Sequence, residues 1–215
     1  MRKFHLILSI IIASYFVIGI YLYPSLPESM ASHWNLKGQV DGYMPKFWGV
    51  FLLPFTAAGL SIIFIVVPRI DPLKANIEKF RRYYDGYVLL FQAFLFYLFL
   101  LTILWNLSVA FSLIQLLTPA IGVVFYSSGI LLDKVKKNWF IGIRTPWTLS
   151  NDVVWDKTHK LGGKLLKITG VITLLGVLVE EIAILVILGP VLVIVVYLIV
   201  YSYLEYKKIE NRTNM

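Results

Sequence analysis

The chain contains no cysteine, and only 15% of its 215 residues are charged. The lack of cysteine excludes disulfide bonds, a cysteine nucleophile and thiolate metal sites. The low charge, with a hydrophobic content of 59% and a mean hydropathy of +0.77, excludes an ordinary water-soluble domain and indicates a membrane protein. The net charge of +8 is divided among short loops, which predicts oriented insertion into a bilayer and no direct nucleic-acid partner.

The sequence also has no phosphate-binding glycine loop, no HExxH helix and no nucleophile elbow. It therefore predicts no catalytic residues, no cofactor and no metal site. The three histidines are the remaining candidates for acid–base or metal chemistry, but the topology derived below separates His33 from His5 and His159. A metal ion held by His33 with Glu28 or Asp41 stays open as an alternative.

Long apolar runs predict an all-α fold, namely a polytopic membrane protein with six transmembrane helices and short amphipathic interfacial helices. About 20 helical residues span roughly 30 Å, which matches the hydrocarbon thickness of a bilayer. The Ser127-Ser128-Gly129 segment predicts a surface on which another helix can approach closely. The expected spans are residues 4–23, 47–67, 87–105 and 109–132, followed by two within 168–204.

The segments between the spans carry different local signals. Residues 24–46 are expected to form a loop with Gly38, Gly42 and Pro45 as turn formers. Only residues 106–108 separate the third and fourth spans, so these two spans must form an antiparallel helical hairpin.

An amphipathic helix is expected in the loop at residues 68–86, with Asp71 as its N-cap and Pro72 at its first position. Its apolar residues recur at helical spacing, which predicts that it lies flat in the membrane interface. These apolar residues are Leu73, Ile77, Phe80 and Tyr84.

The last apolar run, residues 168–204, is too long for one span and suits two. Adjacent carboxylates in the middle of a bilayer cost several kcal/mol, so we expect the turn at Glu180-Glu181. The alternative places the turn at Gly189-Pro190 and buries the two carboxylates.

The cations are strongly asymmetric about these spans. Of the 20 Lys and Arg residues, 18 fall on one side, and Lys37 and Lys46 fall on the other. Because Lys and Arg gather on the cytoplasmic side, the sequence predicts a multi-pass plasma-membrane protein with both termini in the cytoplasm. His33 then lies outside the cell, whereas His5 and His159 lie inside.

Residues 136–164, KKNWFIGIRTPWTLSNDVVWDKTHKLGGK, form a long polar segment that we call the collar. It holds three of the six tryptophans, and tryptophan favours the membrane–water boundary. Ser150 is expected to cap a helix ending near Leu161, and Gly162-Gly163 to bend the chain into the next span. Arg144 is expected to bind a phospholipid headgroup or the last carbonyls of a neighbouring helix.

The collar and the two spans after it resemble the C-terminal module of the SdpI family of membrane immunity proteins. Nine residues carry this resemblance: Asn138, Gly142, Arg144, Thr145, Pro146, Trp147, Trp155, Thr158 and His159. The first loop resembles the domain of unknown function DUF1648 through His33, Asn35, Gly38, Asp41, Gly42 and Lys46. Together they predict a DUF1648-like module at residues 1–67, a central part at 68–132 and an SdpI-like module at 133–215.

The resemblance implies a non-catalytic protein that protects its cell from a secreted antimicrobial peptide and recruits a transcriptional repressor to the membrane. The implied partners are the lipid bilayer, an extracellular peptide toxin at the outer loop and a cytoplasmic repressor protein at the collar. A second class of function remains open. It is a small transporter or a metal-dependent membrane enzyme that uses Glu28, His33 and Asp41, or the Glu180-Glu181 pair.

Overall fold

The structure is a computed structural model that describes residues 2–35, 38–178 and 183–213. Within these ranges, six helices are long and apolar enough to cross a bilayer. Many of their large aliphatic and aromatic side chains are exposed, as expected for helices that contact lipid. The all-α class with six spans is confirmed. The six helices are α1 (Arg2–Leu22), α2 (Lys46–Ile70), α4 (Arg81–Asn106), α5 (Leu113–Leu132), α7 (Asp152–Leu175) and α8 (Ala183–Thr213).

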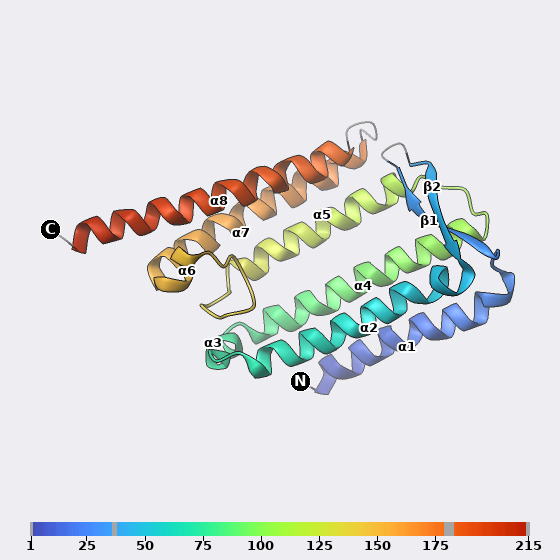
Figure 1. The fold of residues 1–215 in the computed structure, drawn as a ribbon, viewed down its shortest axis with the longest axis horizontal. Coiled ribbons are helices and arrows are strands. Elements are labelled where there is room, and N and C mark those ends of the chain that lie inside the picture. Colours follow the sequence, from blue (N-terminus) through green and yellow to red (C-terminus); the bar gives the residue numbers. More distant parts are fainter. Residues whose placement is uncertain (1, 36–37, 179–182, 214–215) are drawn as a thin grey trace.

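The six long helices form two layers (Figure 1). Helices α1, α2 and α4 make one layer, α5, α7 and α8 make the other, and α4 lies beside α5. The two ends of the chain and the collar lie at one end of the molecule, which we call the collar end. A small β-hairpin lies at the opposite end, the hairpin end.

Helices α5 and α7 touch through glycines. A Cβ atom built on Gly129 would lie 2.6 Å from the Gly163 carbonyl oxygen, and one built on Gly122 would lie 2.8 Å from that of Gly170. Small residues let membrane helices approach this closely. The close approach expected near Gly129 is therefore confirmed, and an Asp133–Lys167 ion pair of 2.5 Å joins the same two helices.

Two apolar clusters fill the interior. The cluster near the hairpin end joins α1, α2, α4 and the hairpin through residues such as Tyr15, Met30 and Phe99. The cluster near the collar end contains Phe4, Ile77, Phe80, Leu131 and Trp155, among others. Because this second cluster draws on both layers and on the collar, it fixes the position of the collar against the first layer.

The loop expected at residues 24–46 is instead mostly a β-hairpin, which follows the short helix η1 (Tyr23–Ser25). Strands β1 (Ser29–Trp34) and β2 (Val40–Pro45) pair antiparallel. Gly38 is in the turn with φ +71°, as expected, but Gly42 lies within β2 opposite His33. A side chain at position 42 would collide with His33, so this glycine serves strand packing and not a turn.

The amphipathic helix expected after residue 68 is shorter than predicted. Helix α2 runs on through Pro68, Asp71 is its C-cap, and α3 (Lys74–Glu78) has only five residues. Asp71 is therefore not the N-cap of the short helix. Ile77 and Phe80 are fully buried in protein, so the apolar stripe packs under the collar and does not lie flat on lipid.

Three boundaries near α5 and α7 also differ from expectation. Helix α5 begins at Leu113 and is capped by Ser112, so the connection from α4 covers residues 107–112. Helix α6 (Pro146–Ser150) ends at the expected N-cap Ser150, and Asn151 caps α7 instead. Helix α7 continues through Gly162-Gly163 without a bend, because these glycines pack against neighbouring helices, Gly163 against α5.

The turn between the last two spans lies between two described elements. Glu180 and Glu181 lie outside the described residues, between η2 (Gly176–Leu178) and Ala183, where α8 begins. Pro190 lies inside α8, and α7 packs beside α8 (Figure 1). The alternative turn at Gly189-Pro190 is therefore wrong.

Candidate functional site

The first-loop motif residues come together in the hairpin. His33 Nδ1 lies 2.5 Å from Asp41 Oδ1 across the two strands. Asn35 accepts the backbone N–H groups of Gly38 and Gln39 and so closes the turn between the strands. These contacts explain why the turn needs Asn35 and Gly38 at their positions.

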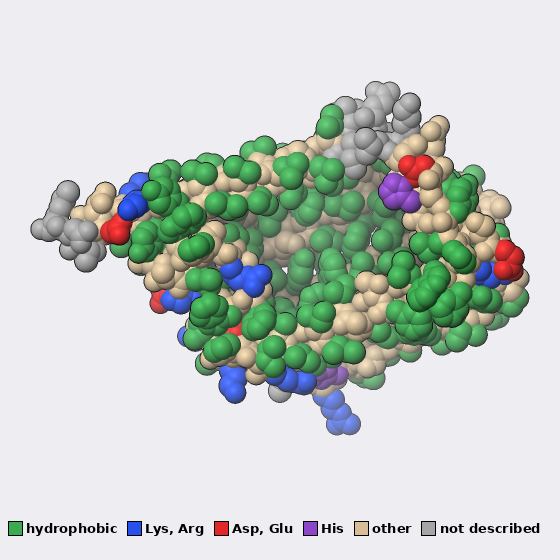
Figure 2. All heavy atoms as spheres, viewed as in Figure 1, with side chains coloured by type: hydrophobic (Ala, Val, Ile, Leu, Met, Phe, Trp, Pro, Cys, Tyr) green, Lys and Arg blue, Asp and Glu red, His purple; other side chains and the backbone are tan. Residues whose placement is uncertain are grey.

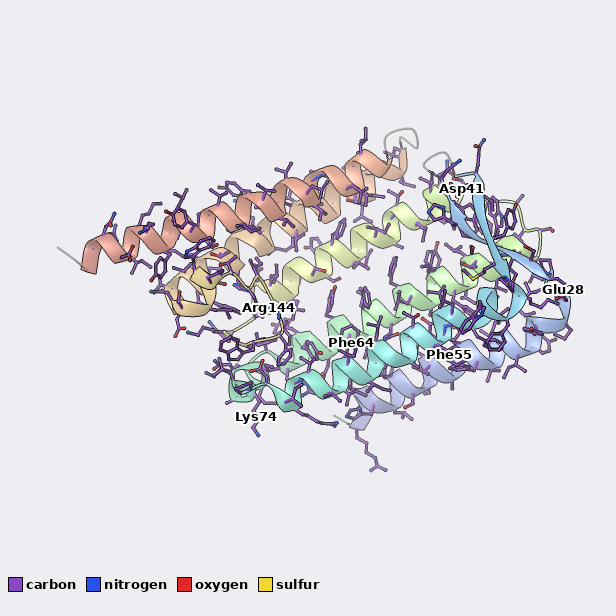
Figure 3. The ribbon with its side chains drawn as sticks, in the orientation of Figure 1. Glu28, Asp41, Phe55, Phe64, Lys74 and Arg144 are labelled. Carbon is purple, nitrogen blue, oxygen red and sulfur yellow. The ribbon has the colours of Figure 1, made fainter. Side chains whose placement is uncertain are left out.

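Lys46 is the last residue of this motif, and it closes the base of the hairpin. Its Nζ donates to Glu28 Oε1 at 2.8 Å, its backbone N–H donates to the Glu28 carbonyl, and its ammonium lies over the Tyr23 ring. Glu28 is thereby held at the base of the hairpin, well apart from Asp41 (Figure 3). Among the described residues, no group of three or more His, Asp or Glu side chains could hold a metal ion.

An apolar cleft of about 340 Å³ lies beside the hairpin, between β1, α2, α4 and α5. It is lined by Trp34 and His33 from the hairpin, Trp48 and Leu52 from α2, and Leu117 from α5, among others. The indole Nε1 of Trp34 is buried and has no hydrogen-bond partner in the described part of the chain. An apolar cleft of this kind is suited to a hydrophobic ligand.

In the collar, most motif residues are buried and hold the segment in shape. The side chain of Asn138 accepts from the N–H groups of Phe140 and Ile141 and donates to two carbonyls. His159 Nε2 accepts from the Ile143 N–H at 2.9 Å while its Nδ1 contacts the Trp155 carbonyl at 2.8 Å, which indicates the neutral Nδ1–H tautomer.

Further contacts hold the collar against α7 and the segment that follows α5. Trp155 stacks on His159 and donates from Nε1 to the Val135 carbonyl. Gly142 adopts φ +113° directly beside His159, where a side chain would collide with the ring. Thr158 is also fully buried in α7.

The Thr-Pro-Trp sequence of the collar starts α6. Thr145 caps this helix in a reciprocal capping box with Thr148, and Pro146 takes the first helical position. Thr145 Oγ1 also lies 3.0 Å from Ser202 Oγ, and the Trp147 ring contacts the Tyr203 ring. The motif therefore docks α6 onto α8.

Arg144 is the exposed cation of this motif. Its Nη1 donates to the Trp139 carbonyl at 2.8 Å, within the same loop. The expected bond to the last carbonyls of a neighbouring helix is therefore wrong, because Trp139 is not helical. The headgroup interpretation stays a prediction.

Several residues that build these two sites could not be identified from the sequence. Asp71 accepts the Trp139 N–H at 2.9 Å and so ties the collar to the end of α2. Asn106 binds the backbone of the hairpin from α4. Trp34 and Trp48 line the hairpin cleft. In the sequence they are visible only as aromatic residues near the end of a span, which indicates a membrane boundary and not a cleft.

Comparison with known proteins connects these features. Residues 134–202 match the SdpI/YfhL protein family, and residues 10–58 match the domain of unknown function DUF1648. "Immunity protein SdpI" of Bacillus subtilis (strain 168) is 26% identical over 210 residues, which cover 97% of this chain and 99% of that protein. No solved structure matches the chain. The two family matches in this order and a relative that aligns over nearly the full length make the chain similar to proteins of the SdpI family, and its six spans make it a multi-pass membrane protein.

Proposed function

We propose that the chain is a non-catalytic immunity protein of the plasma membrane that counters a secreted antimicrobial peptide. Its similarity to a protein named for immunity supports this role. The bias of 18 of 20 cations to one side supports an orientation with the collar end and both termini in the cytoplasm. The hairpin end then faces the outside of the cell, where a secreted peptide arrives.

The single observation that carries the peptide site is the apolar cleft beneath the hairpin. Its two tryptophans offer large apolar surfaces to a hydrophobic peptide. The His33–Asp41 pair, which bridges the two strands of the hairpin, is exposed, so it can contact polar groups of the same peptide. A hydrophobic peptide thus has both an apolar seat and a polar contact at this end.

The collar end is the proposed site for a cytoplasmic repressor. Lys and Arg side chains gather there, whereas the middle of the molecule is hydrophobic (Figure 2). Most motif residues of the collar are buried, so a partner would contact the exposed rim formed by residues such as Lys136, Arg144 and Lys160. In this proposal, binding of a peptide at the hairpin end would change the affinity of this rim for the repressor.

The immunity role is tested in a peptide-sensitive host that lacks its own immunity protein. Expression of the chain should allow growth at peptide concentrations that kill the empty host. The Trp48→Ala variant should lose this protection, whereas Phe47→Ala, at an exposed neighbour outside the cleft, should keep it. Unchanged killing of cells that carry the inserted wild-type protein would refute the immunity role.

The signalling role needs a separate measurement. A fluorescent fusion of a repressor encoded beside this gene should move to the membrane when peptide is added to cells expressing the chain. If the repressor stayed on DNA in protected cells, the signalling role would be refuted, whereas the immunity role would not be affected.

A further inference from the structure

A second and larger cavity, of about 560 Å³, lies between the two layers at the collar end. Its volume falls within the roughly 300–1,000 Å³ of typical ligand pockets. Ile63, Phe64 and Val67 of α2 form one wall, and Leu131 and Leu132 of α5 form the other. The face shown in Figure 2 is hollowed between the layers, and Phe64 lies in the collar half of α2 (Figure 3).

The polar atoms in these walls are already paired with protein. Tyr84 Oη donates to the Phe64 carbonyl at 2.9 Å. Ser128 Oγ donates to the Val124 carbonyl at 2.8 Å and lies 3.1 Å from Tyr87 Oη. The cavity therefore presents mostly apolar surface, which favours an apolar occupant over a polar solute.

The cavity reaches from the membrane boundary into the hydrocarbon layer. Ile63 lies seven residues before the end of α2, and Tyr87 lies six residues after the start of α4. At the rise of an α-helix these separations are about 10 Å and about 9 Å. An occupant would thus have its apolar part inside the bilayer and its other end at the boundary.

Arg144 stands at the boundary end and lines the same cavity. In the described part of the chain, its guanidinium has one hydrogen bond, to the Trp139 carbonyl, and no carboxylate partner. An exposed guanidinium retains several N–H donors and pairs well with phosphate. The charge at the mouth therefore selects an anion.

The loop that carries Arg144 also carries aromatic anchors. Trp139 is 52% exposed and Phe140 is 40% exposed, although both are large apolar side chains. Exposed aromatic residues beside a cation are typical of segments at the headgroup level of a bilayer.

From these observations we propose that the collar-end cavity binds an anionic phospholipid, with one acyl chain between α2 and α5 and the phosphate on Arg144. The two requirements, an apolar seat and an anion at its mouth, are met together by a lipid of this class. A zwitterionic lipid such as phosphatidylcholine has acyl chains but no net negative charge, and free phosphate has no apolar chain, so neither meets both requirements in full. This proposal does not rest on the immunity role.

The test is lipid retention by the purified full-length protein, measured by native mass spectrometry in detergent. The probes are phosphatidylglycerol and phosphatidylcholine with the same acyl chains. Wild-type protein should retain phosphatidylglycerol at least several-fold better than phosphatidylcholine. The Arg144→Gln variant should lose roughly tenfold in phosphatidylglycerol retention, the expected size for a charge-assisted contact.

Matched variants separate the site from general effects. Arg69→Gln removes an exposed cation at the same end of the molecule but outside the cavity, and it should retain lipid like the wild type. Ile63→Trp fills the cavity and should lower retention several-fold, whereas Ile62→Trp, at the exposed neighbour outside the cavity, should not.

Four results would overturn the proposal. The first is equal retention of phosphatidylglycerol and phosphatidylcholine by the wild-type protein. The second is equal retention by the Arg144→Gln and Arg69→Gln variants, and the third is equal retention by the two tryptophan variants. The fourth is a rise in unfolding temperature with inorganic phosphate alone that equals the rise with phosphatidylglycerol, which would make the ligand a free anion. If Arg144→Gln does not fold, the tryptophan pair and the choice between the two lipids still decide the question.

Discussion

Asn106, at the end of α4, binds both backbone groups of Ala31 in β1. Its Oδ1 accepts the Ala31 N–H at 2.8 Å, and its Nδ2 donates to the Ala31 carbonyl at 3.0 Å. The side-chain amide thus takes the place of a neighbouring strand for one residue of the hairpin. This contact fixes the hairpin to the helix whose other residues line the hairpin cleft.

Replacing Asn106 with alanine should detach this part of the hairpin. Ala31 is buried, so its two backbone groups would lose their partners without access to water, at a cost of about 1–3 kcal/mol. The Asn106→Ala protein should therefore unfold at a lower temperature in detergent than the wild type. The exposed Asn211→Ala variant in α8 is the control, and equal melting of the two variants would contradict the assigned contact.

The hairpin also marks the limit of what the sequence could predict. The six helices follow from long apolar runs, a local property that the sequence displays directly. The contact of Ala31 with Asn106 joins residues 75 positions apart, and no local pattern shows it. The sheet was therefore missed, although Gly38 was correctly placed in its turn.

The same reasoning explains the two misread segments at the collar end. The spacing of Ile77 and Phe80 correctly predicted an apolar face, but not that protein would cover it in place of lipid. Gly162-Gly163 carried a signal for flexibility, whereas Gly163 packs against α5 inside a continuous helix. A glycine in a membrane protein is thus interpreted correctly only when its neighbouring helix is known.

The glycine contact between α5 and α7 gives a second prediction. In Gly129→Ala, the new methyl group would meet the Gly163 carbonyl, and the helices would have to separate. Overpacking of this kind costs about 1–3 kcal/mol, so the unfolding temperature should fall. Gly59→Ala is the matched control, because nothing lies within 4 Å of a Cβ at that position. A fall of the same size in both variants would count against close packing of α5 on α7.

Glu205 gives a third prediction, at the collar end of α8. This carboxylate is only 5% exposed, and it accepts from Lys157 of α7 at 2.6 Å and from Lys208 at 2.7 Å. Glu205→Gln should lower the unfolding temperature more than Glu210→Gln, whose exposed ion pair with Lys207 joins residues of one helix only. The comparison is made by thermal unfolding at low and high salt, and an equal effect of the two changes would show that the α7–α8 pair contributes nothing.

The lack of cysteine makes the proposed orientation directly measurable, because any thiol introduced into the chain is the only one. Gln39→Cys places a thiol in the turn of the hairpin, and Ser150→Cys places one on the exposed end of α6 in the collar. In intact cells, a membrane-impermeant maleimide should label Gln39→Cys and leave Ser150→Cys unlabelled.

Permeabilised cells supply the control for that experiment, because Ser150→Cys should then be labelled as strongly as Gln39→Cys. The reason for the expected pattern is the placement of 18 of 20 cations at the collar end, since Lys and Arg are retained on the cytoplasmic side during insertion. If only Ser150→Cys were labelled in intact cells, the assigned orientation would be wrong and the collar end would lie outside the cell. The hairpin cleft would then face the cytoplasm, and a secreted peptide could not reach Trp34 or Trp48 from outside.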